Sequence, residues 1–385
     1  MKTKKRKAGD IIGIIFYMLI GAGCGLLMVD LIETMQVDEQ SMPQFVAMLI
    51  FLFLIMYLAI FLQIVIHEGG HLIFGLLTGY KFSSFRVGSF MWIEEDGKIK
   101  FKRYSLAGTG GQCLMAPPEM VNGRFPVVLY NLGGSIINAL SGILFLIFAL
   151  LTRPWPLVYY FFIIMAIVGV AFALMNGIPL SMGLVNNDGK NALSLGKDPK
   201  ALRAIWIQLT MNHLLAHGVC ITEMPEEWFL EPTEEDLQNN LTSALAVFRC
   251  SRLMEQRCFE EAKAETERLV NGDNAVAGIH KNMLKNDLIF YELIGECNKQ
   301  RIDELNDKQQ KQVAKAMRQN PSIMRTEYAY ALFYEDNSVK AETIKADFDK
   351  MISSYPYQVE IESERRFMEL AYERYIKMEE EQKHE

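Results

Sequence analysis

The chain has 385 residues, in which 39 Lys and Arg stand against 46 Asp and Glu, so its formal net charge is −7. Without a basic excess to neutralise phosphates, nucleic acid is not an expected partner. The six cysteines include no C-x-x-C pair, which excludes a disulfide scaffold and a zinc ribbon. The mean hydropathy of +0.09 is high for a soluble protein. Residues 1–190 carry 14 basic and 11 acidic side chains, and residues 191–385 carry 25 and 35. We therefore expect an apolar membrane part followed by an acidic soluble part.

Four segments of the first half carry no charged side chain and are long enough to cross a membrane, which takes about 20 apolar residues. They are Ile11–Val29, Ser41–Ile66, Phe125–Thr152 and Pro154–Asn187. The last is too long for one untilted helix, so we expect a span from about Trp155 to Met175 and then non-helical backbone, which membrane depth tolerates only beside protein or a cavity. A signal peptide is the alternative for the first segment, but no small-residue cleavage site follows it, and a retained span is preferred.

The basic residues set the expected orientation, because short loops rich in Lys and Arg stay in the cytoplasm. Residues 2–7 hold five basic side chains, and the loop from Lys81 to Arg124 holds seven. The loop from Asp30 to Gln40 holds four acidic side chains and no basic one. Four spans with both termini in the cytoplasm satisfy these loops. The sequence thus predicts a multi-pass protein of the plasma membrane in contact with the lipid bilayer, and the lack of further targeting sequence favours a bacterial one.

One motif follows directly on the second uncharged segment and carries chemistry. His67-Glu-Gly-Gly-His71 places two imidazoles four residues apart, on one face of a helix. That spacing lets both histidines bind one zinc ion. Glu68 lies about 100° around the helix from His67, where it is better placed as a general base for a bound water than as a ligand. The apolar run Leu72–Leu77 continues beyond the motif, so these residues do not simply mark a helix end at the lipid interface.

A catalytic zinc site needs a third protein ligand and an open position for water. Asp188 is the only carboxylate between Glu119 and Asp198. It directly follows the longest uncharged segment, where an ionisable group needs a partner and a cation is a good one. Asp188 is therefore the candidate third ligand.

Together these motifs resemble the site-2 protease family of intramembrane zinc metalloproteases, over roughly residues 44–196. The resemblance rests on the HEGGH motif with the residues that follow it, on Asn131–Asn138 with its paired glycines, on Asn176-Gly-Ile-Pro179, and on Asp188-Gly189. The roles it implies are zinc ligand for His67, His71 and Asp188, with one Zn²⁺ per chain, catalytic base for Glu68, and support of the site for Asn138, Asn176 and Pro179. One spacing departs from the family. Eleven residues separate Asn176 from Asp188, where the usual pattern has about seven, so a bulge or longer loop must absorb the difference.

The loop after the motif has strand character. Phe82–Val87 and Ile99–Tyr104 alternate apolar and polar residues, and Glu94–Gly97 between them is a hairpin signal. Because proteolysis needs an extended substrate, a strand edge beside the zinc can hold substrate by main-chain pairing. The expected substrate-binding residues are Phe82, Ser83, Ser84, Phe85, Arg86 and Val87. The stretch 108–118, with its glycines and prolines, is interpreted as a connector, with a membrane-dipping loop as the alternative.

From about Asp198 onward the apolar spacing is helical. Ala244–Val270 is typical of two helices joined by a turn near Arg257, which resembles one tetratricopeptide repeat, and two further pairs follow. A TPR-like domain offers a concave surface to a protein partner, and a plain helical bundle is the alternative. The expected fold is mainly α, with about four transmembrane helices, a small β-hairpin region and a soluble helical domain. The expected domains are 1–43, an N-terminal transmembrane helix and external loop; 44–196, a metalloprotease core; and 197–385, a cytoplasmic TPR-like domain.

The sequence thus predicts an intramembrane zinc endopeptidase of the kind used in regulated intramembrane proteolysis. Its substrate would be the transmembrane segment of a single-span protein, or a signal peptide. Two alternatives remain: a non-catalytic membrane adaptor that recruits partners through the helical domain, and a metal or proton transporter. The intact Glu68 argues against the first alternative, and the small number of spans without an inverted repeat argues against the second.

Overall fold

The computed structural model describes residues 42–95, 97–104, 109–182 and 185–384, together with short separate stretches between residues 15 and 34. The chain forms two compact units. Unit 1 comprises Met1–Val87 and Gly110–Pro199, and unit 2 comprises Gly88–Thr109 and Lys200–Glu385. The chain therefore leaves unit 1 after the first strand, contributes a hairpin to unit 2, and returns.

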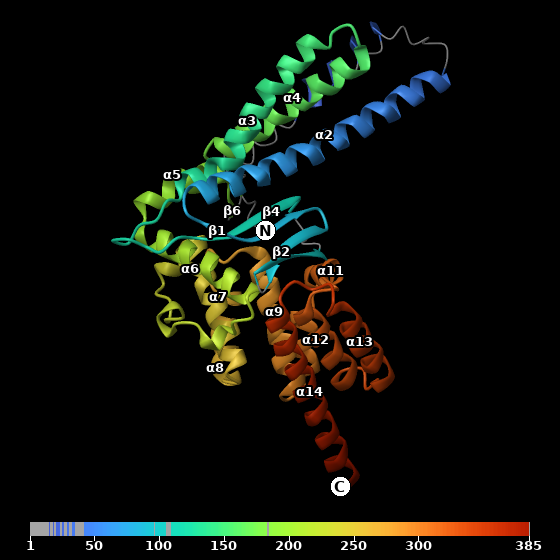
Figure 1. Ribbon diagram of the computed structural model, residues 1–385. Coiled ribbons are helices and arrows are strands. Elements are labelled where there is room, and N and C mark those ends of the chain that lie inside the picture. The colour runs from blue at the N-terminus through green and yellow to red at the C-terminus, as the bar shows by residue number, and fades with distance from the viewer. Residues whose placement is uncertain are drawn as a thin grey trace. The chain divides into compact units, whose positions relative to one another are not determined.

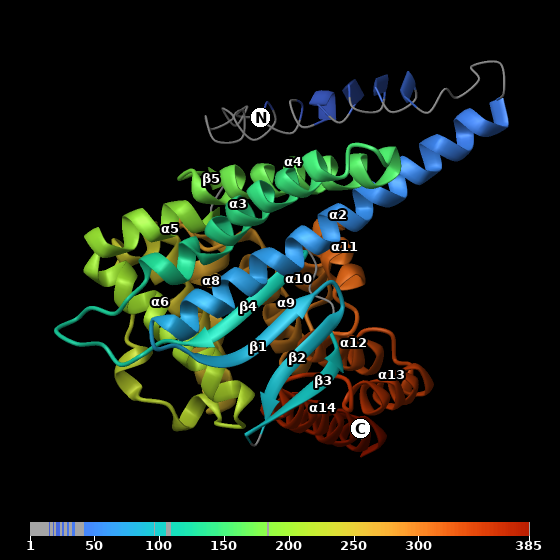
Figure 2. The same cartoon turned by 45° about the horizontal axis from the view of Figure 1, so that its top comes forward.

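Three long helices that lie side by side dominate unit 1 (Figures 1 and 2). They are α2 (Met42–Leu77), α3 (Val128–Leu151) and α4 (Pro156–Gly177), and each is long and apolar enough to cross a membrane. At 1.5 Å per residue α2 measures about 54 Å, well beyond a hydrocarbon core of about 30 Å. These helices confirm three of the predicted spans. The first predicted span, Ile11–Val29, falls largely outside the described residues and stays a prediction.

Glycines set the contact between α2 and α3. A Cβ added to Gly70 would collide with the carbonyl of Gly133, and a Cβ added to Gly133 would collide with the carbonyl of Gly70. Small residues at such crossings let membrane helices approach backbone to backbone, which supplies the van der Waals packing that holds them together in lipid. Because Gly70 lies between His67 and His71, this contact presses the histidine motif against α3.

Two antiparallel strand pairs follow α2. In unit 1, β1 (Lys81–Val87) pairs with β4 (Gly111–Ala116), with a shift of register between Phe82 and Ser84. In unit 2, β2 (Phe90–Glu95) pairs with β3 (Lys98–Arg103) through a turn at Gly97, whose φ of 71° favours glycine. The predicted hairpin region is thereby confirmed. The interpretation of 108–118 as a connector was wrong for Gly111–Ala116, because this short stretch is a strand that buries Cys113 and Met115.

In the uncharged segment that contains α4, the helix ends before the segment does, which confirms the expected non-helical backbone after the span. After Gly177 the chain forms a two-residue antiparallel hairpin, β5 (Ser181–Met182) and β6 (Val185–Asn186). It then begins the short helix α5 (Asp188–Ser194), which packs against α3 and α4. This return places Asp188 at the first turn of a helix that contacts the span carrying Asn138.

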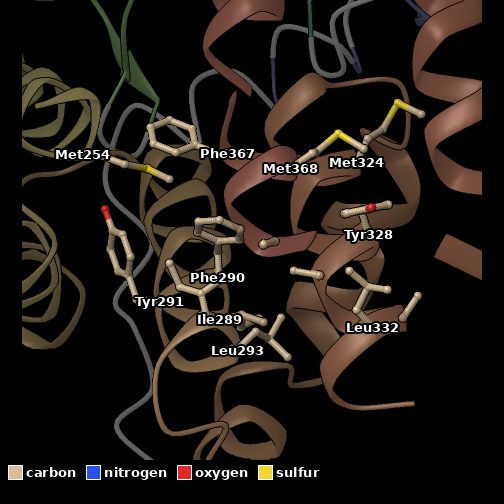
Figure 3. Packing of buried hydrophobic residues seen from close by; sticks show 14 of the residues in the cluster. Met254, Ile289, Phe290, Tyr291, Leu293, Met324, Tyr328, Leu332, Phe367 and Met368 are labelled. Carbon is tan, nitrogen blue, oxygen red and sulfur yellow. The ribbon is translucent and has the colours of Figure 1, made fainter. Parts of the chain in front are cut away.

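Unit 2 is mainly helical, which confirms the predicted helical C-terminal region. Its helices are α6 (Pro199–Ala216), α7 (Asn240–Glu255), α8 (Phe259–Asn271), α9 (Gly278–Ile294), α10 (Lys299–Leu305), α11 (Lys308–Ala316), α12 (Pro321–Phe333), α13 (Ser338–Met351) and α14 (Gln358–His384). The predicted turn between α7 and α8 occurs at Arg257, whose φ is 61°. Figure 3 shows the core of this unit, where Phe290, Tyr328 and Phe367 of three helices pack with leucines and methionines. The TPR-like character stays a prediction.

Candidate metal centre

The two histidines of the motif lie on the buried face of α2. His67 and His71 are each 8% exposed. The four-residue spacing brings their imidazoles together, with 3.2 Å between the two Nε2 atoms. One face of one helix thus supplies two of the three predicted ligands, as the sequence pattern requires.

Asp188 meets this pair from α5. Its Oδ2 lies 3.1 Å from Nε2 of His67 and 3.3 Å from Nε2 of His71. These three residues form the one group of His, Cys, Asp and Glu side chains within the described part of the chain whose donor atoms converge closely enough to hold a metal ion.

The long spacing between Asn176 and Asp188 is taken up by the β5–β6 hairpin. The amide N–H of Asn187 donates to the carbonyl of Leu180 at 3.0 Å, which closes the loop at its base. The Asn187 side chain donates to the carbonyls of Met175 and Ile178 at 2.7 and 2.6 Å, and it accepts from the N–H of Lys190 at 3.0 Å as the cap of α5. Asn187 therefore ties the end of α4 to the start of α5.

Distances within the cluster fit a tetrahedral metal ion. Zinc binds histidine nitrogen and carboxylate oxygen at about 2.0–2.2 Å, so two ligand atoms at tetrahedral angles lie about 3.3 Å apart. The three observed separations are 3.1, 3.2 and 3.3 Å. A neutral imidazole and a carboxylate are also the donor types that Zn²⁺ prefers. The residues therefore fit one zinc ion with a fourth position left for water or substrate.

The outer nitrogens of both rings are held by hydrogen bonds. Nδ1 of His71 lies 2.7 Å from the carbonyl oxygen of Tyr130, and Nδ1 of His67 lies 2.6 Å from Oδ1 of Asn138. A carbonyl oxygen can only accept, so each Nδ1 carries the proton and each Nε2 turns its lone pair into the cluster. Three lone-pair donors then face one another, an arrangement that a cation stabilises and that is repulsive without one.

Glu68 lies beside the cluster and points toward β4. It is 9% exposed and interacts electrostatically with His67, His71 and Asp188. A Cβ added to Gly111 would lie 2.6 Å from its Oε1, so a glycine is needed where β4 passes the carboxylate. Glu68 is thus close to the three candidate ligands without being one of them.

The residues predicted to support the site or to bind substrate differ in whether they contact the cluster. Asn138 contacts His67 directly. The Asn176 amide instead donates to the carbonyl of Phe172 in its own helix, at 3.1 Å, and Pro179 is exposed in the turn after α4. In β1, residues Phe82–Val87 pair with β4, and Ser83, Ser84 and Arg86 are buried. Their assignment to substrate stays a prediction. Among the described residues β4 is an edge strand of this sheet.

Four residues that contact or position parts of the site were not predicted from the sequence: Gln63, Gly111, Tyr130 and Asn187. Gln63 carried a signal, because it is a buried amide within a charge-free span, one turn before His67. Asn187 carried the Asn-before-helix signal of an N-cap. Tyr130 contributes a backbone carbonyl and Gly111 a missing side chain, and neither is visible in sequence.

The three apolar helices, the two buried histidines with the partly buried Asp188, and the adjacent Glu68 form the arrangement of a membrane-embedded metallopeptidase. Comparison with known proteins agrees. Residues 42–223 match the family described as Peptidase M50B-like. The match covers just under half of the chain and is consistent with its resemblance to the site-2 proteases. No match was found among the curated proteins or the solved structures.

Proposed function

We propose that the protein is a zinc endopeptidase that cleaves a peptide bond in or near the transmembrane segment of a single-span protein or signal peptide. The observation that carries the proposal is the convergence of His67, His71 and Asp188 at 3.1–3.3 Å, with the lone pairs of both histidines turned inward. We further propose one Zn²⁺ per chain, a bacterial plasma membrane, and both termini in the cytoplasm.

Glu68 supplies the acid–base chemistry. His67, His71 and Asp188 would hold a zinc ion, which would supply Lewis acidity to a water and to the scissile carbonyl. Glu68 takes a proton from that water as its oxygen bonds to the carbonyl carbon. The same carboxyl gives the proton to the departing amine nitrogen as the C–N bond breaks. The burial of Glu68 against Gly111 holds its carboxyl on the β4 side of the cluster.

Substrate must be extended where it is cut, and strand pairing provides this. An edge strand presents free N–H and C=O groups to an added strand. Gly111 places the start of β4 against Glu68, so substrate pairing along the β4 edge brings a backbone to the base. The role predicted for Phe82–Val87 then includes supporting β4 from its other side. The helical unit 2 would recruit a protein partner or select substrates.

The test compares the wild type with Glu68→Gln in the same bacterial membrane, with new peptide termini mapped by mass spectrometry. We expect cleavage products with termini in transmembrane segments for the wild type. In the variant, whose zinc ligands are intact, product formation should fall about 10²–10⁴-fold with zinc content unchanged. Glu119→Gln, at an exposed carboxylate of unit 1, is the matched control and should cleave normally.

The outcomes separate the alternatives. Undiminished cleavage by Glu68→Gln contradicts the role of Glu68 as base. A zinc-free wild type whose cellular phenotype survives Glu68→Gln indicates an adaptor. Metal or proton flux in proteoliposomes without a peptide product indicates a transporter.

A further inference from the structure

Gln63 is a fully buried amide of α2, one helical turn before His67, and its side chain forms hydrogen bonds with two other helices, α3 and α4. It is 0% exposed. Its Nε2 donates to the carbonyl of Met165 in α4 at 3.0 Å. Its Oε1 accepts from Nδ2 of Asn138 at 2.7 Å and from Oγ of Ser141 at 3.2 Å, both in α3. No part of the metallopeptidase chemistry described above uses this residue.

The hydrogen bonds fix the orientation of both amides. The Met165 carbonyl can only accept, so the NH₂ group of Gln63 must face it and Oε1 must face Asn138. The NH₂ group of Asn138 then has two acceptors on Gln63, Oε1 and the backbone carbonyl, the latter at 3.1 Å. Oδ1 of Asn138 is consequently left to face Nδ1 of His67, 2.6 Å away.

From this series of hydrogen bonds we infer that Gln63 is a positioning residue for the metal centre. It sets the tautomer and the ring orientation of His67 through Asn138. The inference rests on the proposed zinc function. Because Oδ1 of Asn138 accepts, the proton of His67 is on Nδ1 and the lone pair of Nε2 points to the cluster. Partners of this kind commonly change metal affinity 10–100-fold when they are lost.

The neighbouring backbone leaves the side chains of Gln63 and His67 little room to change rotamer. A Cβ added to Gly169 would lie 2.8 Å from Nε2 of Gln63, and a Cβ added to Gly134 would lie 2.5 Å from Cε1 of His67. Both the amide and the imidazole therefore occupy slots bounded by glycine backbone. A ligand whose rotamer is locked by packing and by a hydrogen-bonded neighbour is preorganised for its metal.

A simpler role for Gln63 is to hold the helices together, since interhelical hydrogen bonds in membranes contribute about 0.6 kcal/mol on average. The two roles differ in what they change. Loss of a helix contact lowers stability equally with and without zinc. Loss of a positioning contact weakens zinc binding as well.

The experiment measures zinc affinity by chelator competition, and the unfolding temperature of the metal-free form, on the purified full-length protein in detergent. Gln63→Met keeps the length of the side chain and removes its polar end, and we expect its zinc affinity to fall 10–100-fold. Gln63→Glu keeps oxygen acceptors for Asn138 and Ser141 and should bind zinc more tightly than Gln63→Met. Ser141→Ala removes the other donor to Oε1 but leaves the path to His67, and should match the wild type.

A Gln63→Met variant that binds zinc like the wild type, with only its unfolding temperature lowered, overturns the inference. Should that variant not fold, ¹⁵N NMR of the histidines in the wild type decides, because the inference requires the proton of His67 on Nδ1 and fails if it is on Nε2. A wild type that binds no zinc contradicts the proposed function itself, whereas zinc binding insensitive to Gln63 contradicts only this role.

Discussion

Unit 1 and unit 2 each contain a cluster of ionisable side chains, and the two clusters differ in how their charges are compensated. In unit 2 the side chain of Arg325 is 1% exposed, and its guanidinium lies 2.6 Å from Asp287, 3.0 Å from Glu364 and 4.4 Å from the centre of the Phe290 ring. Here the chain supplies both signs of charge. In unit 1 His67, His71 and Asp188 direct lone pairs at one another, and among the described residues the ion-pair partners of Asp188 are these two histidines.

The difference separates a structural cluster from a binding one. In unit 2 the positive charge of Arg325 comes from the chain itself and lies between two carboxylates, one more than it can neutralise. Donors that converge without a proton or cation are compensated only when a metal arrives. The comparison predicts that breaking the unit 2 cluster affects stability, whereas breaking the unit 1 cluster affects metal binding.

The largest expected effect on stability comes from Arg325→Met. It leaves Asp287 and Glu364 without their cation, and removal of one partner from a buried ion pair typically costs about 3–5 kcal/mol. Chemical unfolding of the full-length protein, followed by the fluorescence of unit 2, measures the loss. Arg365→Met is the control, because Arg365 forms an exposed ion pair with Asp349 and such pairs contribute about 0–1 kcal/mol. Equal effects of the two substitutions would refute the structural role of the cluster.

A smaller expected effect is a dependence of the free energy of unfolding on pH, caused by Glu364. Burial raises the pKa of Glu364 to about 7 from an ordinary value of 4.5, although Arg325 opposes the shift. The folded state therefore binds the Glu364 proton more tightly than the unfolded state does. Its contribution to stability is fully present below pH 4.5 and is lost as the pH rises through 7.

Glu364→Gln should remove the loss of stability that accompanies ionisation of Glu364 as the pH rises. The variant should gain stability relative to the wild type between pH 4.5 and pH 7, by up to about 3 kcal/mol, since one pKa unit corresponds to about 1.4 kcal/mol. Unfolding curves of both proteins at several pH values in this range measure the difference. A difference that is constant with pH, or that shrinks as pH rises, would show that the Glu364 carboxyl is not shifted upward in the fold.

The sequence predicted those parts of the site that depend on local geometry. The HEGGH spacing, the lone carboxylate at Asp188 and three spans were visible because helix periodicity and the scarcity of charge in lipid are local rules. The missed features depend on contacts between distant segments. Gln63 meets Asn138 across 75 residues, and Arg325 meets Asp287 across 38.

The strand β4 was missed for a related reason. Gly111–Ala116 is short, begins with glycine and runs into Pro117 and Pro118, which are features of a loop when read alone. Its pairing with β1 and the approach of Glu68 turn the same residues into a strand. Likewise, the long interval before Asp188 became compatible with ligation only through the β5–β6 hairpin and the side chain of Asn187.

Elemental analysis combined with zinc titration, on the purified full-length wild type and on Asp188→Ala, decides whether His67, His71 and Asp188 bind one zinc ion. We expect one zinc ion per wild-type chain, with nitrogen and oxygen ligands at about 2.0–2.2 Å by X-ray absorption, and a large loss of affinity in the variant with unit 2 still folded. A wild type without stoichiometric zinc, or an Asp188→Ala variant that binds zinc as tightly as the wild type, would contradict this expectation.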